Sequence, residues 1–276
     1  MFVRNQSFFV GPNFSSGSGF DVYCPPVIHT ATEDGIATLR IEHGKANALD
    51  TELLRDLSAA LGDARSARAR AVVLTGTGTI FGAGVDLFRV ISGGDAYARE
   101  FVPGLARFLA ELFEYPLPVV AAVNGHAIAG GCVVACACDY RIMAEGKGTI
   151  GVPELVVGVP FPASAIEIMR FAVPLHELQA LVYTGRTCTA DEAVRRGLVN
   201  EAVPADQLLD RARPIACQFA SIPSAVFAAT KQALRAESAA RVRQNRSLDD
   251  VVGHWASADT RAHIQQYLDR TVRKQR

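Results

Sequence analysis

Hydrophobic and polar positions divide the chain into two parts of different character. Up to about residue 155, short runs rich in valine and alanine alternate with segments in which apolar residues recur every three or four positions. The first pattern is typical of buried strands, and the second is typical of helices that turn one face toward a core. Strands are predicted at 36–43, 70–75, 118–123 and 139–144, and a short strand is predicted at 149–154.

The helical pattern accounts for most of the remaining chain. Asp50 or Thr51 can cap a helix over 51–64. Proline suits the first turn of a helix but interrupts its interior, so Pro103 predicts the start of a new helix and Pro214 predicts a kink or a break. Further helices are predicted from about 85, at 95–102, 103–115, 132–138, 162–171, 174–183, 190–196, 204–219, 222–238 and 257–273. The repeated strand–helix units indicate an α/β layer, over which the helical last part of the chain packs.

Composition restricts the class of protein further. Lysine plus arginine and aspartate plus glutamate both number 28, so the net charge is zero, which gives no support for a nucleic acid or an anionic membrane as partner. No apolar run reaches the length of a membrane span. Three of the six cysteines cluster at Cys132, Cys136 and Cys138, but on a helix Cys138 points away from the other two, and no histidine lies at ligand spacing. We therefore expect no metal site and a reducing, cytoplasmic setting.

Two glycine-rich loops follow buried strands, G-A-G-V-D at 82–86 and A-G-G-C at 129–132. Glycine lets the main chain approach a ligand closely, and each loop can direct one backbone N–H into a shared cleft. Two such donors form an oxyanion hole, in which each donor typically stabilises a transition state by about 2.7–4 kcal/mol. The alternative is a close-packed strand-to-helix turn that binds no ligand.

An oxyanion hole needs a base or a nucleophile beside it. The chain has no G-x-S-x-G motif, and Glu154 is the carboxylate that lies in an apolar stretch, G-V-P-E-L-V-V-G-V-P. Burial there is expected to raise its pKa, so that Glu154 can act as a general base near neutral pH. The alternative is a solvated turn residue. Asp139, at the end of the predicted buried helix, is expected to bind backbone groups or Arg141, and Trp255 and Tyr267 are expected in the core or an interface.

The sequence resembles the crotonase superfamily, which contains enoyl-CoA hydratases and isomerases. The resemblance extends from about Ile28 to the C-terminus, and its motifs are more specific for the superfamily than for any one reaction. They are H-G-K-A-N-A-L-D at 43–50, I-F-G-A-G-V-D-L at 80–87, A-A-V-N-G-H-A-I-A-G-G-C at 121–132, A-C-D-Y-R-I-M-A-E at 137–145, I-G-V-P-E-L-V-V-G-V-P at 150–160 and Y-T-G-R-T-C-T-A-D-E-A-V-R-R-G-L-V-N-E-A-V-P at 183–204.

The resemblance implies an α/β fold in which residues 28–200 form a spiral of ββα units with the CoA and catalytic site. Residues 201–276 would then form a helical region that covers the site and builds homotrimers, usually paired into homohexamers. Residues 1–27 are predicted to be a flexible leader. The implied substrate is an acyl-CoA thioester, and because its CoA part arrives with the substrate, no separate cofactor is expected.

The same resemblance assigns roles to individual residues. The oxyanion N–H groups fall on Val85 and Gly130, in agreement with the two glycine loops. Family members often carry a lysine shortly after the second motif to meet CoA phosphates, whereas this chain has Phe88 at that position and Arg89 after it. CoA contacts are expected at Lys45, Ala46, Ala83, Asp86, Leu87 and Lys231.

Val133 is the important departure from the family pattern. Family hydratases use two glutamates, and this chain has Glu154 for the second but valine where the first belongs. One carboxylate with an oxyanion hole resembles a Δ3,Δ2-enoyl-CoA isomerase, in which a single glutamate moves the proton. The alternatives are an enoyl-CoA hydratase of fatty-acid breakdown with a substituted first glutamate, and a weakly catalytic acyl-CoA-binding protein.

Overall fold

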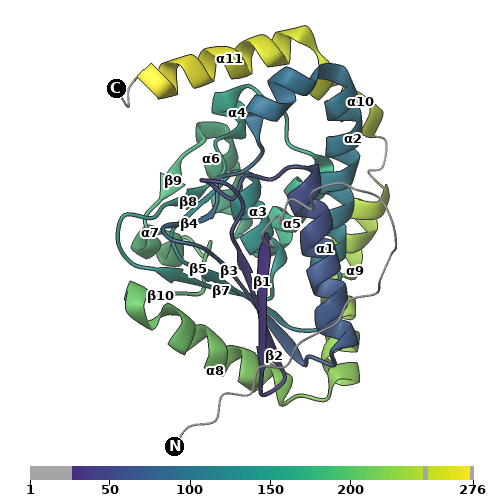
Figure 1. Cartoon of the computed structure of the whole chain (residues 1–276), viewed down its shortest axis with the longest axis vertical. Helices are drawn as coiled ribbons and strands as arrows, with labels where there is room; N and C mark the ends of the chain where they lie inside the picture. Colours follow the sequence, from purple (N-terminus) through teal and green to yellow (C-terminus); the bar gives the residue numbers. More distant parts are fainter. Residues whose placement is uncertain (1–26, 245–247, 274–276) are drawn as a thin grey trace, which may run out of the picture.

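A six-stranded sheet forms the centre of the computed structural model, which describes residues 27–244 and 248–273 (Figure 1). Neighbouring strands are parallel except for the first pair, which is antiparallel. All residues of the third and fourth strands of the sheet are buried, which explains their continuous apolar runs. In spatial order the strands are β1 (Ile28–Glu33), β2 (Ile36–Ile41), β3 (Ala71–Gly76), β5 (Val119–Val123), β7 (Tyr140–Ala144) and β10 (Glu201–Val203).

A second sheet is built from short strands, three of which each come directly after a strand of the first sheet along the chain. Its order is β4 (Ile80–Gly82), β6 (His126–Ile128), β8 (Ile150–Gly151) and β9 (Thr187–Cys188). The chain therefore repeats strand, short strand, helix: β3–β4–α2 (Leu87–Phe113), β5–β6–α3 (Gly130–Ala137) and β7–β8–α4 (Glu154–Val157). The expected α/β fold of ββα units is confirmed. Strands of two or three residues are too short to show an alternating pattern, so β4, β6, β9 and β10 were not predicted. The six-residue edge strand β1 was not predicted either, because it has no buried face: its residues are exposed except for the half-buried Ile28.

Helices cover both faces of the six-stranded sheet. On one face, α1 (Thr51–Ser66), α2 and α3 join the larger core, and the Asp50 side chain caps α1 by accepting from Leu53 N, as predicted. On the other face, α8 (Leu208–Ala220) packs its apolar side against Val73, Val120 and other strand residues (Figure 1). The remaining helical elements are α5 (Ala163–Ala172), α6 (Leu175–Thr184), α7 (Ala190–Arg195), η1 (Ala205–Gln207), α9 (Ser224–Gln244), α10 (Leu248–Ala256) and α11 (Ala258–Arg273).

The last two helices return to elements from earlier in the chain. Figure 1 shows α10 beside α2 and α11 above α4, and both pairs are in contact. α10 was not predicted from the sequence. None of the helices in the described ranges is long and apolar enough to cross a lipid bilayer. The predicted leader at 1–27 lies, except for Val27, outside the described residues.

Pro103 and Pro214 do not divide the helices in which they lie. α2 continues through Pro103, and its break lies at Gly94, where φ is 59° and ψ is −144°. α8 likewise continues through Pro214 as one element. A proline costs a helix one hydrogen bond, but Phe101, Val102 and other buried side chains of α2 hold the turn in place. Glycine adopts the left-handed conformation without a steric penalty, so the break falls there.

A buried ionic cluster joins α9 to the sheet. The Asp139 carboxylate accepts from Lys231 Nζ at 2.8 Å, from Arg235 Nη2 at 2.8 Å and from the backbone N of Val119 at 2.8 Å. The predicted backbone contact is thus confirmed, but the cationic partners come from α9. Arg141 donates instead to the Leu198 carbonyl oxygen, at 2.9 Å.

Candidate active site

The two glycine loops lie in direct contact. Gly84 has a φ of 84°, and a Cβ atom there would come within 2.6 Å of the Ala129 Cβ atom and 3.2 Å of the Ile128 carbonyl oxygen. A Cβ on Gly131 would collide with the Gly82 carbonyl oxygen. Both loops therefore need glycine because their main chains pack against each other, and this contact brings the predicted donors of Val85 and Gly130 to one place.

The backbone N–H of Val85 is left unpaired by the way its neighbours bond. Leu49 forms a parallel bridge with Val85, in which Leu49 N donates to Gly84 O at 2.6 Å and Asp86 N donates to Leu49 O at 3.0 Å. In such a bridge the central residue directs its own N–H to the opposite side. Among the described residues Val85 N has no acceptor.

The backbone N–H of Gly130 is unpaired for a different reason. Gly130 is the first residue of α3, and the first N–H groups of a helix have no partner within the helix. The preceding residue, Ala129, has a positive φ of 53° and caps the helix without a side-chain hydrogen bond. Ala129 N itself donates to Gly151 O at 2.8 Å, which fixes the turn. The helix dipole favours negative charge at this end.

A cavity of about 110 Å³ lies beside the two donors. Its wall contains the oxyanion candidates, Glu154 and a largely apolar remainder contributed by distant parts of the chain. Trp255 and Tyr267 belong to this wall as well, although no local sequence pattern places them near the glycine loops. Trp255 Nε1 donates to Pro160 O at 3.1 Å. The lining residues are Ala83, Val85, Leu87, Leu105, Leu109, Ile128, Ala129, Gly130, Val133, Pro153, Glu154, Val157, Val159, Pro162, Ala165, Trp255 and Tyr267.

Glu154 is the single carboxylate among the described residues that line this cavity. It is 7% exposed, and within the described part of the chain its Oε2 atom has no hydrogen-bond partner. Burial raises the pKa of Glu154 from 4.5 to about 8, because the ionised form loses its hydration. Val133, where the family resemblance places the first glutamate of the hydratases, is buried in the same wall. A carboxyl with a raised pKa and one unpaired oxygen, beside two unpaired N–H donors, can move a proton next to a polarised carbonyl.

A second cleft, of about 400 Å³, adjoins the first and shares Ala83, Val85 and Leu87 with it. Five of the six residues expected to contact CoA line this cleft. They are Lys45, Ala46, Ala83, Asp86 and Leu87. The two hollows therefore lie side by side, with the exposed Lys45 in the wall of one and Glu154 in the wall of the other.

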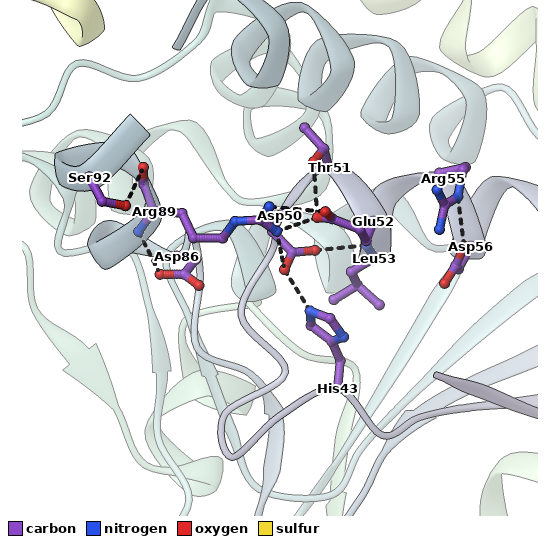
Figure 2. Close-up of polar contacts among 10 residues, drawn as sticks. All are labelled: His43, Asp50, Thr51, Glu52, Leu53, Arg55, Asp56, Asp86, Arg89 and Ser92. Carbon is purple, nitrogen blue, oxygen red and sulfur yellow. Dashed lines mark hydrogen bonds and ion pairs between the residues drawn. The ribbon is translucent and has the colours of Figure 1, made fainter. Parts of the chain in front are cut away.

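Lys231, the sixth expected CoA contact, is placed elsewhere. Its ammonium is 6% exposed and is paired with Asp139 and with the Leu117 carbonyl oxygen in the buried ionic cluster, and it lines neither hollow. Its position on α9 therefore does not support the CoA contact. Phe88 is 65% exposed at the second cleft, while the Arg89 guanidinium turns away to bind Glu52 and Asp50 (Figure 2).

His126 and Cys138 have internal partners. His126 Nδ1 accepts from the backbone N of Thr149 at 3.2 Å, as expected for a side chain that packs within the turn. Cys138 Sγ donates to Val134 O at 3.4 Å, one turn back along the chain. In the described ranges no group of three or more His, Cys, Asp or Glu side chains is placed to hold a metal ion.

Comparison with known proteins agrees with the geometry. The family model described as enoyl-CoA hydratase/isomerase matches residues 31–274, so the chain belongs to the enoyl-CoA hydratase/isomerase family. It is similar to carnitinyl-CoA dehydratase of Salmonella agona, with 33% identity over 217 residues that cover 76% of this chain and 81% of the relative. It is also similar to mouse mitochondrial enoyl-CoA delta isomerase 1, with 28% identity over 251 residues, 90% of this chain and 86% of the relative.

The fold is shared with a solved structure of an isomerase. The crystal structure of human mitochondrial delta3-delta2-enoyl-CoA isomerase superposes with a TM-score of 0.86 at 25% sequence identity, covering 90% of this chain and 99% of the human chain. The relatives thus include both a dehydratase and isomerases, and membership of the family does not by itself select one reaction.

Proposed function

We propose that the protein is an enoyl-CoA isomerase that shifts the double bond of a 3-enoyl-CoA to position 2. The observation that carries this proposal is that Glu154 is the single carboxylate lining the cavity in the described part of the chain. Val133 lines the same cavity and stands where the family resemblance places the first glutamate of the hydratases. Hydration requires one group to hold water and another to transfer a proton, and the valine side chain can do neither. An isomerisation needs one base that takes a proton and returns it.

The reaction balances with one carboxylate. Glu154 removes a proton from C2 of the thioester, and the electron pair moves into a dienolate whose negative oxygen accepts hydrogen bonds from Val85 N and Gly130 N. The same carboxylic acid then returns the proton to C4, which moves the double bond from between C3 and C4 to between C2 and C3. No oxidant, reductant or external proton is consumed, so the step needs no added cofactor.

The oxyanion hole and the buried Glu154 both reduce the difference in acidity between the thioester α-proton and the carboxylic acid. The α-proton of a thioester is far less acidic than a carboxylic acid, so the dienolate must be stabilised before the proton can transfer. Two N–H donors aimed at the developing oxyanion each contribute roughly 2.7–4 kcal/mol in comparable enzymes. The raised pKa of Glu154 makes its carboxylate a stronger base than an exposed glutamate.

The direct test is product identification with matched substrates. The wild-type protein is incubated separately with 3-enoyl-CoA and trans-2-enoyl-CoA thioesters of several lengths, and products are identified by mass and absorbance. We expect isomerisation of the 3-enoyl substrate without gain of mass, and little gain of 18 mass units from the 2-enoyl substrate. Fast hydration of the 2-enoyl substrate would favour a hydratase, which is the reaction class nearer to the Salmonella relative.

Glu154→Gln separates catalysis from binding. We expect turnover to fall by at least about 1000-fold while the affinity for a saturated acyl-CoA stays near that of the wild type, because general-base removal affects the chemical step. Turnover that survives this substitution would exclude Glu154 as the base. Absence of turnover in the wild type, combined with tight acyl-CoA binding, would instead favour the weakly catalytic binding protein.

We further propose that the chain assembles into homotrimers, or pairs of them. Exposed apolar side chains support an association surface: Leu234 on α9 is 70% exposed, and Leu175 and Tyr183 on α6 are 68% and 69% exposed. Sedimentation velocity gives the assembly mass directly. A monomer at micromolar concentration would contradict the proposal.

A further inference from the structure

One carboxylate outside the cavity joins three segments around the oxyanion site (Figure 2). Asp50 is 5% exposed, and its Oδ1 accepts from Leu53 N at 2.8 Å as the cap of α1. Its Oδ2 accepts from His43 Nε2 at 2.7 Å and from Arg89 Nη1 at 3.0 Å. Asp50 therefore connects the segment 43–50, the start of α1 and the start of α2.

Arg89 is held at both its side chain and its backbone. Its Nη2 donates to Glu52 Oε1 at 2.9 Å and its Nη1 also contacts Glu52, a paired geometry that lowers the pKa of Glu52 to about 2. Its guanidinium carbon lies 5.3 Å from the ring centroid of Tyr97. Its backbone N donates to the Asp86 side chain at 3.0 Å. Figure 2 shows Arg89 reaching from α2 to the carboxylates at the start of α1.

These contacts enclose the backbone bridge that directs the Val85 N–H. Asp50 directly follows Leu49, and Arg89 lies in the first turn of α2, three residues after Asp86. The Asp50–Arg89 ion pair thus holds together the two chain segments that form the Leu49–Val85 bridge. Neither Asp50 nor Arg89 lines the reaction cavity.

We infer that Asp50 and Arg89 are positioning residues for the oxyanion hole, which fix the direction in which the Val85 N–H points. The inference rests on the proposed role of Val85 as a donor to the thioester oxygen. Hydrogen bonds weaken steeply as their angle departs from linearity, and a misplacement of about 1 Å can cost roughly 100-fold in rate. Loss of the ion pair lets the Leu49–Val85 bridge rotate. The hydrogen bond from Val85 N–H to the thioester oxygen then weakens, while the one from Gly130 N–H remains.

The test measures polarisation of a bound thioester. Asp50→Asn keeps a good helix cap but removes the charge, and Arg89→Met keeps an apolar chain over Tyr97 but removes the guanidinium. Arg99→Met, which removes an arginine paired with Asp95 on the exposed side of the same helix, is the matched control. The readout is the ¹³C chemical shift of the carbonyl of saturating [1-¹³C]butanoyl-CoA, with kcat for a 3-enoyl-CoA measured in parallel.

We expect a downfield carbonyl shift in the wild type and in Arg99→Met, and a smaller one in both Asp50→Asn and Arg89→Met. We also expect kcat to fall by about 10- to 100-fold in these two variants, less than the loss of a whole donor. An unchanged carbonyl shift in the two variants would overturn the inference, even if their activity fell. No downfield shift in the wild type, or an equal decrease in Arg99→Met, would overturn it too.

The spectroscopic readout separates this inference from the proposed reaction. If the wild type does not isomerise a 3-enoyl-CoA, the proposed function fails, while the carbonyl shift still decides whether Asp50 and Arg89 orient the donor. If Arg89→Met does not fold, Asp50→Asn decides the outcome, because its helix cap remains.

Discussion

At the scale of single residues, the isolation of Glu154 sets how the site responds to pH. Its carboxyl lacks a hydrogen-bond partner at Oε2 among the described residues, and its pKa is raised to about 8 by burial. The base form predominates only above this pKa, and below it the ionised fraction falls about tenfold per pH unit. We expect kcat/KM to rise about tenfold per pH unit below pH 8 and to level off above it. A profile of kcat/KM from pH 5.5 to 9.5 checks this, and a plateau that begins below pH 6 would contradict it.

Lys45 gives a residue-scale prediction for the second cleft. It is the exposed lysine of that cleft, so Lys45→Met should weaken attraction for a CoA phosphate without touching the reacting atoms. We expect KM to rise about two- to fivefold with kcat nearly unchanged, as for the loss of an exposed ion pair. Raising the ionic strength should reduce the difference in KM between the wild type and Lys45→Met. Lys147→Met, another exposed lysine but one that lines neither hollow, is the control; an equal rise in KM there would contradict the prediction.

Residues whose role depends on local backbone geometry could be predicted from the sequence. Gly130 follows a buried strand and opens a buried helix, and Glu154 interrupts an apolar stretch, so both carry a local pattern that indicates their use. Trp255 and Tyr267 could not be placed in the cavity this way, because they lie on helices that return from about a hundred residues downstream. For Lys231, the resemblance indicated a phosphate contact, whereas the buried Asp139 carboxylate pairs with it.

At the scale of elements, Gly131 shows how α3 is fitted against the neighbouring loop. In a helix, alanine is ordinarily more stable than glycine by about 0.5–1 kcal/mol. A Cβ at Gly131 would collide with the backbone at Gly82, so alanine should be less stable than glycine at this position. We expect Gly131→Ala to lower the free energy of unfolding by about 1–3 kcal/mol and to reduce turnover by displacing one loop.

Gly62 offers the matched control for this prediction. It lies within α1, and a Cβ there would meet no atom within 4 Å. We expect Gly62→Ala to raise the free energy of unfolding by about 0.5–1 kcal/mol. Urea titrations of both variants measure the two changes, and stabilisation by Gly131→Ala would show that the loops separate easily.

Element boundaries could be predicted where a long apolar pattern or a cap defines them. The helix capped by Asp50 and the strand at 119–123 were located to within about two residues for this reason. Short strands such as β6 gain their stability from pairing with strands that are distant in sequence, which no local pattern reveals. The continuous α2 through Pro103 likewise depends on tertiary burial that outweighs one lost hydrogen bond.

At the scale of the whole molecule, the Asp139 cluster connects the C-terminal helices to the central sheet. Asp139→Asn leaves the charges of Lys231 and Arg235 buried without a full counterion. Breaking a buried pair typically costs about 3–5 kcal/mol, and we expect a loss of that size in the free energy of unfolding. Chemical denaturation measures it. Asp95→Asn, which breaks the exposed pair with Arg99, should change stability little; equal effects would show that the cluster is not buried in solution.

The buried carboxyl of Glu154, whose Oε2 atom has no hydrogen-bond partner among the described residues, also affects the stability of the folded protein. Its folded-state pKa of about 8 exceeds the ordinary 4.5, so the folded state binds more protons than the unfolded state between these values. The free energy of unfolding should therefore fall as pH rises through this window, by up to roughly 5 kcal/mol in total. Glutamine cannot ionise, so Glu154→Gln should become the more stable protein as pH approaches 8. Urea titrations from pH 5 to 9 would contradict this if the difference between the two proteins stayed constant. Under the proposed function, the protein accepts this loss of stability at high pH because the same buried carboxylate is the base that moves the proton.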